Sequence, residues 1–532
     1  MSFALPPVGD ETGRRAYELM LELVAIPSVT GSEGENTCAR FIHDRLSRLA
    51  CFKKDPRDLR LIELDGDPLG RFFVAALLRA SGTKKTVILT GHFDVVDADV
   101  CGPLRPWAFD PAEYTARMGG LVLPEDARKD LESGSYLFGR GVSDMKAGIA
   151  LNICLLEDYA ERREELEFNV LLLLVPDEEG DSAGMRGAIS FLARLKEEEG
   201  LDFLICIDTE PVFDTYSPAI YHGTIGKIMP LYLCVGRESH AGEYYDGLNS
   251  TLVASYLNVA LDGGKDTVET LGSQTFQPQC CLRMRDLRSR YAVTLPERTV
   301  LYYNCLTVEK TPAVVLEDMK KRAMAAMTSA LAHVGRDWTP RVLTVEEVLR
   351  KAAEAAGGKE RLFAEFLPRL SSADERERSI EFLSQALDLL GEKGPLVVVG
   401  FVPPYYPPRV NGKEGGRAVR LAAADAGKEL ERRGYSLAER EVFQGITDLS
   451  FTGFGGKAEE LAPLAANTPL WGRNYGLPLA DLQKIDIPCV VFGPIGKDSH
   501  KITERVETGY TFGVLPSVLK GFIKSVFQRS IS

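Results

Sequence analysis

Three of the six histidines in this chain lie in short motifs whose residue types suit metal binding. His92 lies in Gly91-His92-Phe93-Asp94, His240 in Ser239-His240-Ala241-Gly242, and His500 closely follows the pair Gly493-Pro494. Neutral imidazole is the commonest metal ligand in proteins. Because histidine is so scarce here, its concentration in motifs indicates that the chemistry lies at these positions.

Carboxylates follow the apolar segments between these histidines. Asp177-Glu178-Glu179 come directly after the apolar run 169–175, and Asp208 and Glu210 follow the run 203–207. Crowded carboxylates repel one another, so either one of them acquires a raised pKa suited to a general base or a cation neutralises the group. A solvated acidic turn is the structural alternative for the first group.

Two further acids have spacings that suit a metal site. In extended backbone the side chains of His92 and Asp94 leave the same face, which places a carboxylate where it can orient a metal-binding imidazole. Asp144 lies in a glycine-rich turn, Gly139-Arg140-Gly141-Val142-Ser143-Asp144, that opens a helical pattern. A helix N-cap is the alternative for Asp144.

These side chains need strands and helices to position them. Short runs rich in branched apolar residues at 86–90, 169–175, 203–207 and 488–492 predict buried strands, and apolar positions at helical spacing over 10–25, 146–159 and 185–196 predict helices. This alternation favours an α/β fold with a mainly parallel sheet flanked by helices. Ligands bind at the carboxyl ends of such strands, where His92, the two acidic groups and His500 all lie.

A second domain interrupts the first. Between residues 227 and 405 the pattern changes to strands at 228–235 and 298–305 and helices at 249–261 and 313–334. We therefore expect a discontinuous catalytic domain, 1–226 and 406–532, and a lid domain, 227–405, with a helical insertion at about 345–390.

Composition excludes several classes of function. The chain of 532 residues has 76 acidic and 63 basic residues, a net charge of −13, which argues against binding to nucleic acid or to an anionic membrane. The start, Met1–Pro7, has no signal-peptide pattern and no apolar run reaches membrane-spanning length, so we expect a cytoplasmic protein. The ten cysteines contain no Cys-x-x-Cys pair and are expected to be reduced.

The motifs, in their order along the chain, resemble the M20 family of metallopeptidases and amidohydrolases. The resemblance rests on Ile26-Pro27-Ser28, His92-Phe93-Asp94, Asp144-Met145-Lys146, Asp177-Glu178-Glu179, Glu210-Pro211, the His240 motif and Gly493-Pro494 with His500. The long lid and the segment 403–408, which is rich in proline and tyrosine, are most similar to the branch called arginine utilization protein. The resemblance implies a zinc-peptidase-like α/β domain with an inserted ferredoxin-like α+β lid.

The resemblance also implies a site with two zinc ions bridged by Asp144. His92 and Glu210 would complete one ion's ligands, and Glu179 and His500 the other's. Glu178 would be the general base, and Asp94 would orient His92. Imidazole and carboxylate ligands suit zinc, with cobalt or manganese as alternatives. After the run 203–207 Asp208 competes with Glu210 as the ligand, and the Glu-Pro pair favours Glu210.

Residues of the lid and of the segment 445–450 set the expectations about partners and substrate. By resemblance, His240 would reach the partner subunit's active site in a homodimer formed through the lid and stabilise the oxyanion there. Asn304, Thr447 and Asp448 are the candidate substrate contacts. The arginine that grips a substrate carboxylate in many members is absent, because Leu306 or a neighbour stands there. Arg283, Arg285, Arg288 and Arg290 are candidate replacements, with an exposed basic loop as the structural alternative.

We therefore expect a metal-dependent hydrolase that cleaves an amide bond in a small peptide or an N-acyl amino acid. The alternative is a non-hydrolytic binding or regulatory protein of amino-acid (arginine) catabolism that retains the fold.

Overall fold

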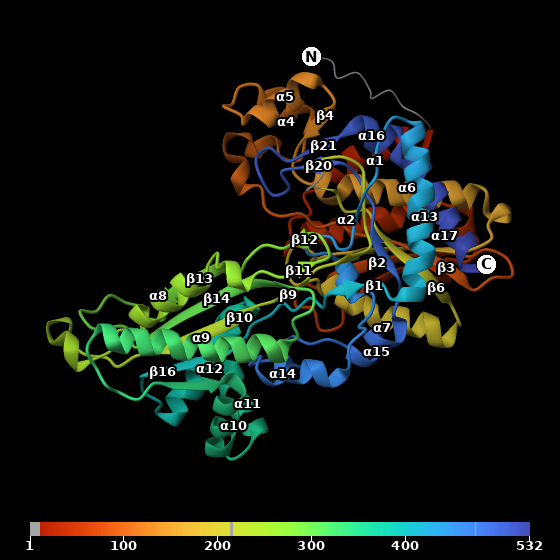
Figure 1. Ribbon diagram of the computed structural model, residues 1–532. Coiled ribbons are helices and arrows are strands. Elements are labelled where there is room, and N and C mark those ends of the chain that lie inside the picture. Colours follow the sequence, from red (N-terminus) through yellow and green to blue (C-terminus); the bar gives the residue numbers. More distant parts are fainter. Residues whose placement is uncertain (1–10, 213–215, 474, 532) are drawn as a thin grey trace. The chain divides into compact units, whose positions relative to one another are not determined.

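The computed structural model describes residues 11–212, 216–473 and 475–531, which form two compact units (Figure 1). Unit 1 contains the described residues up to Thr224 together with Arg409–Phe454 and Ala480–Ser532. Unit 2 contains Ile225–Pro408 and Gly455–Leu479. The segment 1–7, used above to argue against a signal peptide, lies outside the described residues.

The boundary expected from the sequence is wrong for residues 455–479, which were assigned to the catalytic domain. This segment belongs to unit 2, where the Asn467 side chain accepts a hydrogen bond from the Glu346 backbone at 3.0 Å and Arg473 pairs with Glu360 at 2.7 Å. These contacts join residues more than a hundred positions apart, so no local sequence pattern reports them.

An eight-stranded sheet forms the centre of unit 1. Its strands, in spatial order, are β1 (Leu59–Glu63), β2 (Phe72–Leu78), β5 (Asn169–Val175), β3 (Lys85–His92), β6 (Asp202–Asp208), β19 (Cys489–Val491), β7 (Ala219–Tyr221) and β18 (Ala438–Arg440). The neighbours β5, β3, β6 and β19 run parallel. Every residue of β5 is buried, as expected for a strand covered on both faces.

Helices pack on this sheet and on one another. They are α1 (Glu11–Val24), α2 (Glu33–Leu46), α3 (Ala50–Lys54), α6 (Ala147–Glu161), α7 (Ala183–Glu198), α13 (Lys413–Arg432), α15 (Leu479–Ile485), α16 (Thr508–Gly513) and α17 (Leu515–Ile531). Of these, α2, α6, α7 and α17 contact strands of the sheet directly. In Figure 1, α6, α13 and α17 lie above the strands of unit 1 and α7 lies below them. The predicted α/β fold with a mainly parallel, helix-flanked sheet is confirmed.

A small subsidiary core lies beside the segment that carries His500. It consists of a 3-10 segment (Asp99–Trp107), α4 (Pro111–Met118), α5 (Glu125–Ser133) and β4 (Tyr136–Phe138). Strand β4 pairs with β21 (Arg505–Glu507), which pairs with β20 (Gly496–Lys497). The buried Arg505 contacts Asp126 and Asp130 of α5 at 2.9 and 2.7 Å, so this subdomain anchors the loop that joins β20 to β21.

Unit 2 has a ferredoxin-like core. Its main strands are β10 (Pro230–Val235), β13 (Cys280–Asp286), β14 (Arg298–Thr307) and β16 (Leu396–Phe401), in the antiparallel order β13-β14-β10-β16, with α8 (Ser250–Leu261) and α9 (Pro312–His333) as the two helices. This is the βαββαβ arrangement expected for the lid. The shorter strands are β9 (Gly226–Ile228), β15 (Arg341–Thr344), the pair β11 (Thr270–Leu271) and β12 (Gln274–Thr275), and, within unit 1, the pair β8 (Gly223–Thr224) and β17 (Arg409–Val410).

Three inserted helices cover one face of the unit 2 sheet. They are α10 (Val345–Ala356), α11 (Lys359–Phe366) and α12 (Glu375–Leu390), and the short α14 (Ala462–Ala466) belongs to the same unit. Along β10 the alternate residues Leu231, Leu233 and Val235 pack in one core with these helices. A capping box of Thr344 and Glu347 starts α10, and Gly357 ends it at φ 77°.

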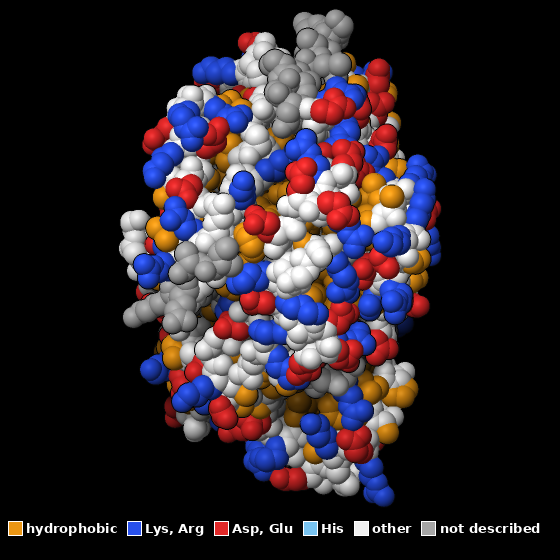
Figure 2. Space-filling view, turned by 90° about the vertical axis from the view of Figure 1, so that its right-hand side faces the viewer, with side chains coloured by type: hydrophobic (Ala, Val, Ile, Leu, Met, Phe, Trp, Pro, Cys, Tyr) orange, Lys and Arg blue, Asp and Glu red, His pale blue; other side chains and the backbone are white. Residues whose placement is uncertain are grey.

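The described surface carries mixed charge. On the face drawn in Figure 2, basic and acidic side chains are interspersed. Among the described helices none is long and apolar enough to cross a membrane.

Candidate metal centre

The carboxyl ends of three parallel strands bring the predicted residues together in unit 1. Strand β3 lies between β5 and β6, with His92 opposite Val175 and Thr90 opposite Asp208. Residues that directly follow β5 and β6 therefore emerge beside the imidazole of His92.

His92 contacts carboxylates through its Nε2 atom. That atom lies 3.2 Å from Oδ1 of Asp144 and 3.1 Å from Oε1 of Glu210, and 3.9 Å from Oε2 of Glu178. The other ring nitrogen, Nδ1, lies 3.0 Å from the backbone oxygen of Asp94. Donation from Nδ1 to that oxygen leaves Nε2 with a free lone pair in the neutral ring.

His500 approaches the same Asp144 carboxylate from its other oxygen. Its Nε2 lies 3.3 Å from Oδ2 of Asp144 and 2.8 Å from Oε1 of Glu179. Asp144 therefore lies between two imidazoles, with one carboxylate oxygen directed to each. His500 is half exposed, whereas His92 is buried.

The donor set fits divalent metal ions. Two sets of three residues could each hold a metal ion, because the ligand atoms within each set all lie within 4.8 Å of one another. One set is His92, Glu178 and Glu210, and the other is His92, Asp144 and Glu179. Ligands at about 2.0–2.1 Å from a tetrahedral zinc ion are about 3.3 Å apart. The contacts of 2.8 to 3.3 Å around Asp144 are close to this spacing, whereas Glu178 lies farther from His92.

The electrostatics also favour a cation. Burial by itself lowers the pKa of His92, but the charge of Glu210 and hydrogen bonds to Asp144 and Asp94 raise it well above its usual value. Burial raises the pKa of Glu210 to about 7, with a further contribution from Asp144. Burial is also the main cause of the strongly raised pKa of Glu178. Excess buried negative charge that draws protons onto imidazoles would equally attract metal ions.

Asp94 holds the acidic turn that follows β5. Its Oδ1 accepts a hydrogen bond from the Glu178 backbone at 3.1 Å, and Oδ2 accepts from the Glu179 backbone at 3.3 Å and from the Thr30 hydroxyl at 2.9 Å. The same carboxylate lies 3.4 Å from Nδ1 of His92. Asp94 thus connects one imidazole to the backbone of two carboxylates.

Asp177, the first acid of the turn, lies in a different environment. It forms an ion pair with buried Arg71, which also contacts Asp67 at 2.7 Å and Glu35 at 3.7 Å. Its φ of 68° is in the left-handed region, and its Oδ2 accepts a hydrogen bond from the Ala183 backbone at 3.0 Å. The sequence did not separate the three acids of this turn, and it did not predict Arg71 as a partner.

The other candidates of unit 1, Thr447, Asp448 and Asp208, are all buried. The Thr447 hydroxyl accepts a hydrogen bond from the Leu449 backbone at 3.1 Å. Burial raises the pKa of Asp448 to about 7, and the Asp448 charge in turn contributes to the raised pKa of Glu178. Asp208 is buried near Glu210, but Glu210 is the residue that contacts His92.

The remaining candidates lie in unit 2. His240 is exposed, and its Nδ1 accepts a hydrogen bond from the Gly242 backbone at 3.1 Å, so Nε2 carries the proton of the neutral ring. Asn304 lies on β14, and its side-chain oxygen is buried without a hydrogen-bond partner among the described residues. Of the arginines considered for substrate binding, Arg285 pairs with Glu377 and Arg288 with Asp286.

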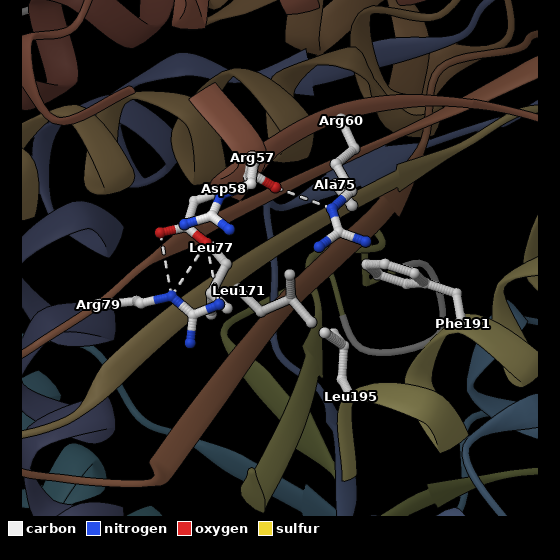
Figure 3. Close-up of a pocket in the computed structure, with 9 residues that line it drawn as sticks. All are labelled: Arg57, Asp58, Arg60, Ala75, Leu77, Arg79, Leu171, Phe191 and Leu195. Carbon is white, nitrogen blue, oxygen red and sulfur yellow. Dashed lines mark hydrogen bonds and ion pairs between the residues drawn. The ribbon is translucent and has the colours of Figure 1, made fainter. Parts of the chain in front are cut away.

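A separate charged hollow on β1 and β2 has a structural explanation (Figure 3). Arg79 donates to Asp58 at 2.9 Å, and Arg60 donates to the Arg57 carbonyl at 2.8 Å. Arg79 also donates to Glu199 at 2.6 Å. The acids balance much of this basic charge, and the pairs link the ends of β1 and β2 to the end of α7.

Comparisons with known proteins give a consistent result. Residues 88–461 match the family model described as peptidase family M20/M25/M40. The uncharacterized protein YqjN of Bacillus subtilis is 33% identical over 98% of both chains, and protein RocB of Bacillus subtilis is 29% identical over 95% of this chain and 94% of its own. The crystal structure of Bacillus subtilis YXEP, described as a dinuclear metal binding peptidase from the M20 family, matches with a TM-score of 0.50 at 13% identity, covering 98% of this chain and 99% of its own.

Proposed function

The chain belongs to peptidase family M20/M25/M40, and from this membership and the geometry of the site we propose that it is a metal-dependent hydrolase that cleaves an amide bond in a small peptide or an N-acyl amino acid. The resemblance to the M20 family found in the sequence is thereby confirmed. The family membership supports a hydrolase, and the bond and substrate are our proposal.

One observation carries the proposal of two metal ions. The two oxygens of Asp144 face different imidazoles, His92 at 3.2 Å and His500 at 3.3 Å, and each imidazole has one further carboxylate beside it, Glu210 and Glu179 respectively. A bridging carboxylate with two ligands on each side is what a dinuclear site requires. We propose zinc, for which this mixture of imidazole and carboxylate is suited, with cobalt or manganese as alternatives.

Bound metal ions would polarise the scissile carbonyl and lower the pKa of the attacking water. Glu178 would take the proton from that water and return it to the leaving amine. Its greater distance from His92, 3.9 Å against 3.1 Å for Glu210, supports a base rather than a ligand. Its raised pKa, which results mainly from burial, suits a group that must both accept and donate a proton.

We further propose that the protein acts as a homodimer formed through unit 2. Strand β13 is the edge of that sheet, and Leu282 and Met284 on it and Val259 on α8 are exposed. An edge strand with exposed apolar neighbours can pair with a second copy. His240 would then act in the partner's site, where its Nε2–H would donate to the oxyanion.

The experiment combines metal counting with a substrate screen. The zinc-loaded protein is assayed on dipeptides and N-acyl amino acids, and its metal content is measured by atomic emission. Glu178→Ala should retain two ions per chain and lose about 10²- to 10⁴-fold in turnover. The exposed Glu164, changed to Ala in the same unit, is the control and should retain full activity.

Unchanged turnover in Glu178→Ala would refute the assigned base. Two bound ions without hydrolysis of any amide would instead support the alternative, a non-hydrolytic binding protein.

A further inference from the structure

A buried ion pair lies next to the proposed metal site but outside its ligand set. The side chains of Arg140 and Glu504 are 1% and 2% exposed and pair directly, although 364 positions separate them in the chain. Removing one partner of such a pair leaves an uncompensated buried charge, so the pair is costly to break.

Each member of the pair holds the backbone of a different metal-ligand segment. Oε1 of Glu504 accepts hydrogen bonds from the backbone of Ser143 and Asp144, each at 3.4 Å. Arg140 donates to the backbone oxygens of Asp97 at 3.1 Å and His500 at 3.4 Å. The pair therefore joins the turn that carries Asp144 to the loop that carries His500.

The two imidazoles differ in what else supports them. His92 ends a strand that is paired on both sides, and its ring is 1% exposed. His500 lies in a loop with a φ of 67°, a left-handed conformation that is unfavourable for a residue with a side chain, and its ring is 50% exposed. Packing holds His92 in place, whereas the His500 loop depends on specific hydrogen bonds such as the one from Arg140.

We propose that Arg140 and Glu504 are positioning residues that act selectively on one of the two metal positions, the one formed by Asp144, Glu179 and His500. This inference rests on the proposed dinuclear site. Asp144 is shared by both positions, but the sheet still holds His92 at one of them, so loss of the pair would weaken the position at His500 most. Partners behind metal ligands typically contribute 10- to 100-fold in affinity.

The test is a stepwise zinc titration of the metal-free full-length protein by calorimetry. The main variant, Arg140→Met with Glu504→Met, removes both charges at once and so avoids an unpaired buried charge. Glu504→Gln is a second variant that keeps the side-chain shape and one acceptor oxygen but leaves the buried Arg140 charge without its counter-ion. The control, Arg45→Met with Glu157→Met, removes another ion pair of unit 1. This pair joins α2 to α6 at 2.7 Å. Thermal unfolding in a chelator checks that each variant folds.

We expect two binding steps in the wild type and in the control. In the double variant one step should stay within about threefold of wild type and the other should weaken by about 10- to 100-fold. Glu504→Gln should weaken the same step. Equal weakening of both steps, or two unchanged steps, in either variant would overturn the inference while leaving the proposed function standing. A wild-type protein that binds fewer than two zinc ions would refute the dinuclear site itself, and the inference with it.

Discussion

The Asp94→Asn substitution tests how the acidic turn is held in the metal site. The Asp94 carboxylate accepts three hydrogen bonds, from the backbone of Glu178 and Glu179 and from Thr30, at 2.9 to 3.3 Å. An amide group has only one acceptor oxygen. In either orientation of the amide, its NH₂ group faces the backbone N–H of Glu178 or Glu179 and cannot accept a hydrogen bond from it.

The expected loss of metal affinity follows from the number of hydrogen bonds that the Asp94→Asn side chain can no longer accept. At least one charge-assisted hydrogen bond is lost, which is about 1.5–3 kcal/mol. Since about 1.4 kcal/mol corresponds to a tenfold change in an equilibrium constant, we expect metal affinity to fall by about 10- to 100-fold if the loss appears in metal binding. Turnover at saturating metal should fall as well, because Glu178 moves with the turn.

The assay is zinc competition with a chromogenic chelator, followed by hydrolysis measured with excess metal. Thr30→Val is the matched control, because it removes one hydrogen bond to the same carboxylate without changing the backbone contacts to Glu178 and Glu179. It should change metal affinity by about two- to fivefold, about 0.5–1 kcal/mol, because the Thr30 hydroxyl shares its one proton between Asp94 and the Val95 backbone oxygen at 3.1 Å. Wild-type metal affinity and turnover in Asp94→Asn would refute the reasoning.

Three other predictions concern the donor in unit 2, a buried acid and the metal itself. His240→Ala should lower turnover by about 10²- to 10³-fold with unchanged metal content, whereas His333→Ala, in the same unit but outside the motif, should be neutral; full activity of His240→Ala would remove the oxyanion role. Burial, with the charge of Asp94, raises the pKa of Glu35 from 4.5 to about 8. Between these two pH values the folded state holds a proton that the unfolded state has lost, so the free energy of unfolding should decline as pH rises from 4.5 to 8. From pH 6 to pH 9, the free energy of unfolding measured in urea should fall less in Glu35→Gln than in wild type, by on the order of 2 kcal/mol. An equal fall in both proteins would contradict the raised pKa of Glu35. Chelation should abolish hydrolysis and lower the unfolding temperature, both restored by zinc, since an ion present at a hundred times its Kd stabilises the fold by about 2.7 kcal/mol; an unchanged unfolding temperature would argue against bound metal.

The sequence predicted the strands that carry the site because their signals are local. The apolar runs at 86–90, 169–175 and 203–207 correspond to β3, β5 and β6, and the polar residues that follow them were visible without any tertiary information. Parallel strands align their carboxyl ends, so the meeting of His92 with Glu178 and Glu210 could be expected from order and periodicity.

The sequence could not assign separate environments to neighbouring acids. Asp177 and Glu178 are adjacent, yet one pairs with Arg71 and the other lies 3.9 Å from His92. That difference depends on a positive φ at Asp177 and on an arginine 106 positions away. The membership of 455–479 in unit 2 depends on similarly distant contacts.

By itself, then, the sequence determined the types of ligand, their order and the ends of strands on which they lie, because these follow from local periodicity and residue chemistry. Only the tertiary structure decided which oxygen of Asp144 faces which imidazole, and that Arg140 and Glu504 join the two ligand segments. These contacts join residues from 52 to 364 positions apart, so no pattern along the chain reports them.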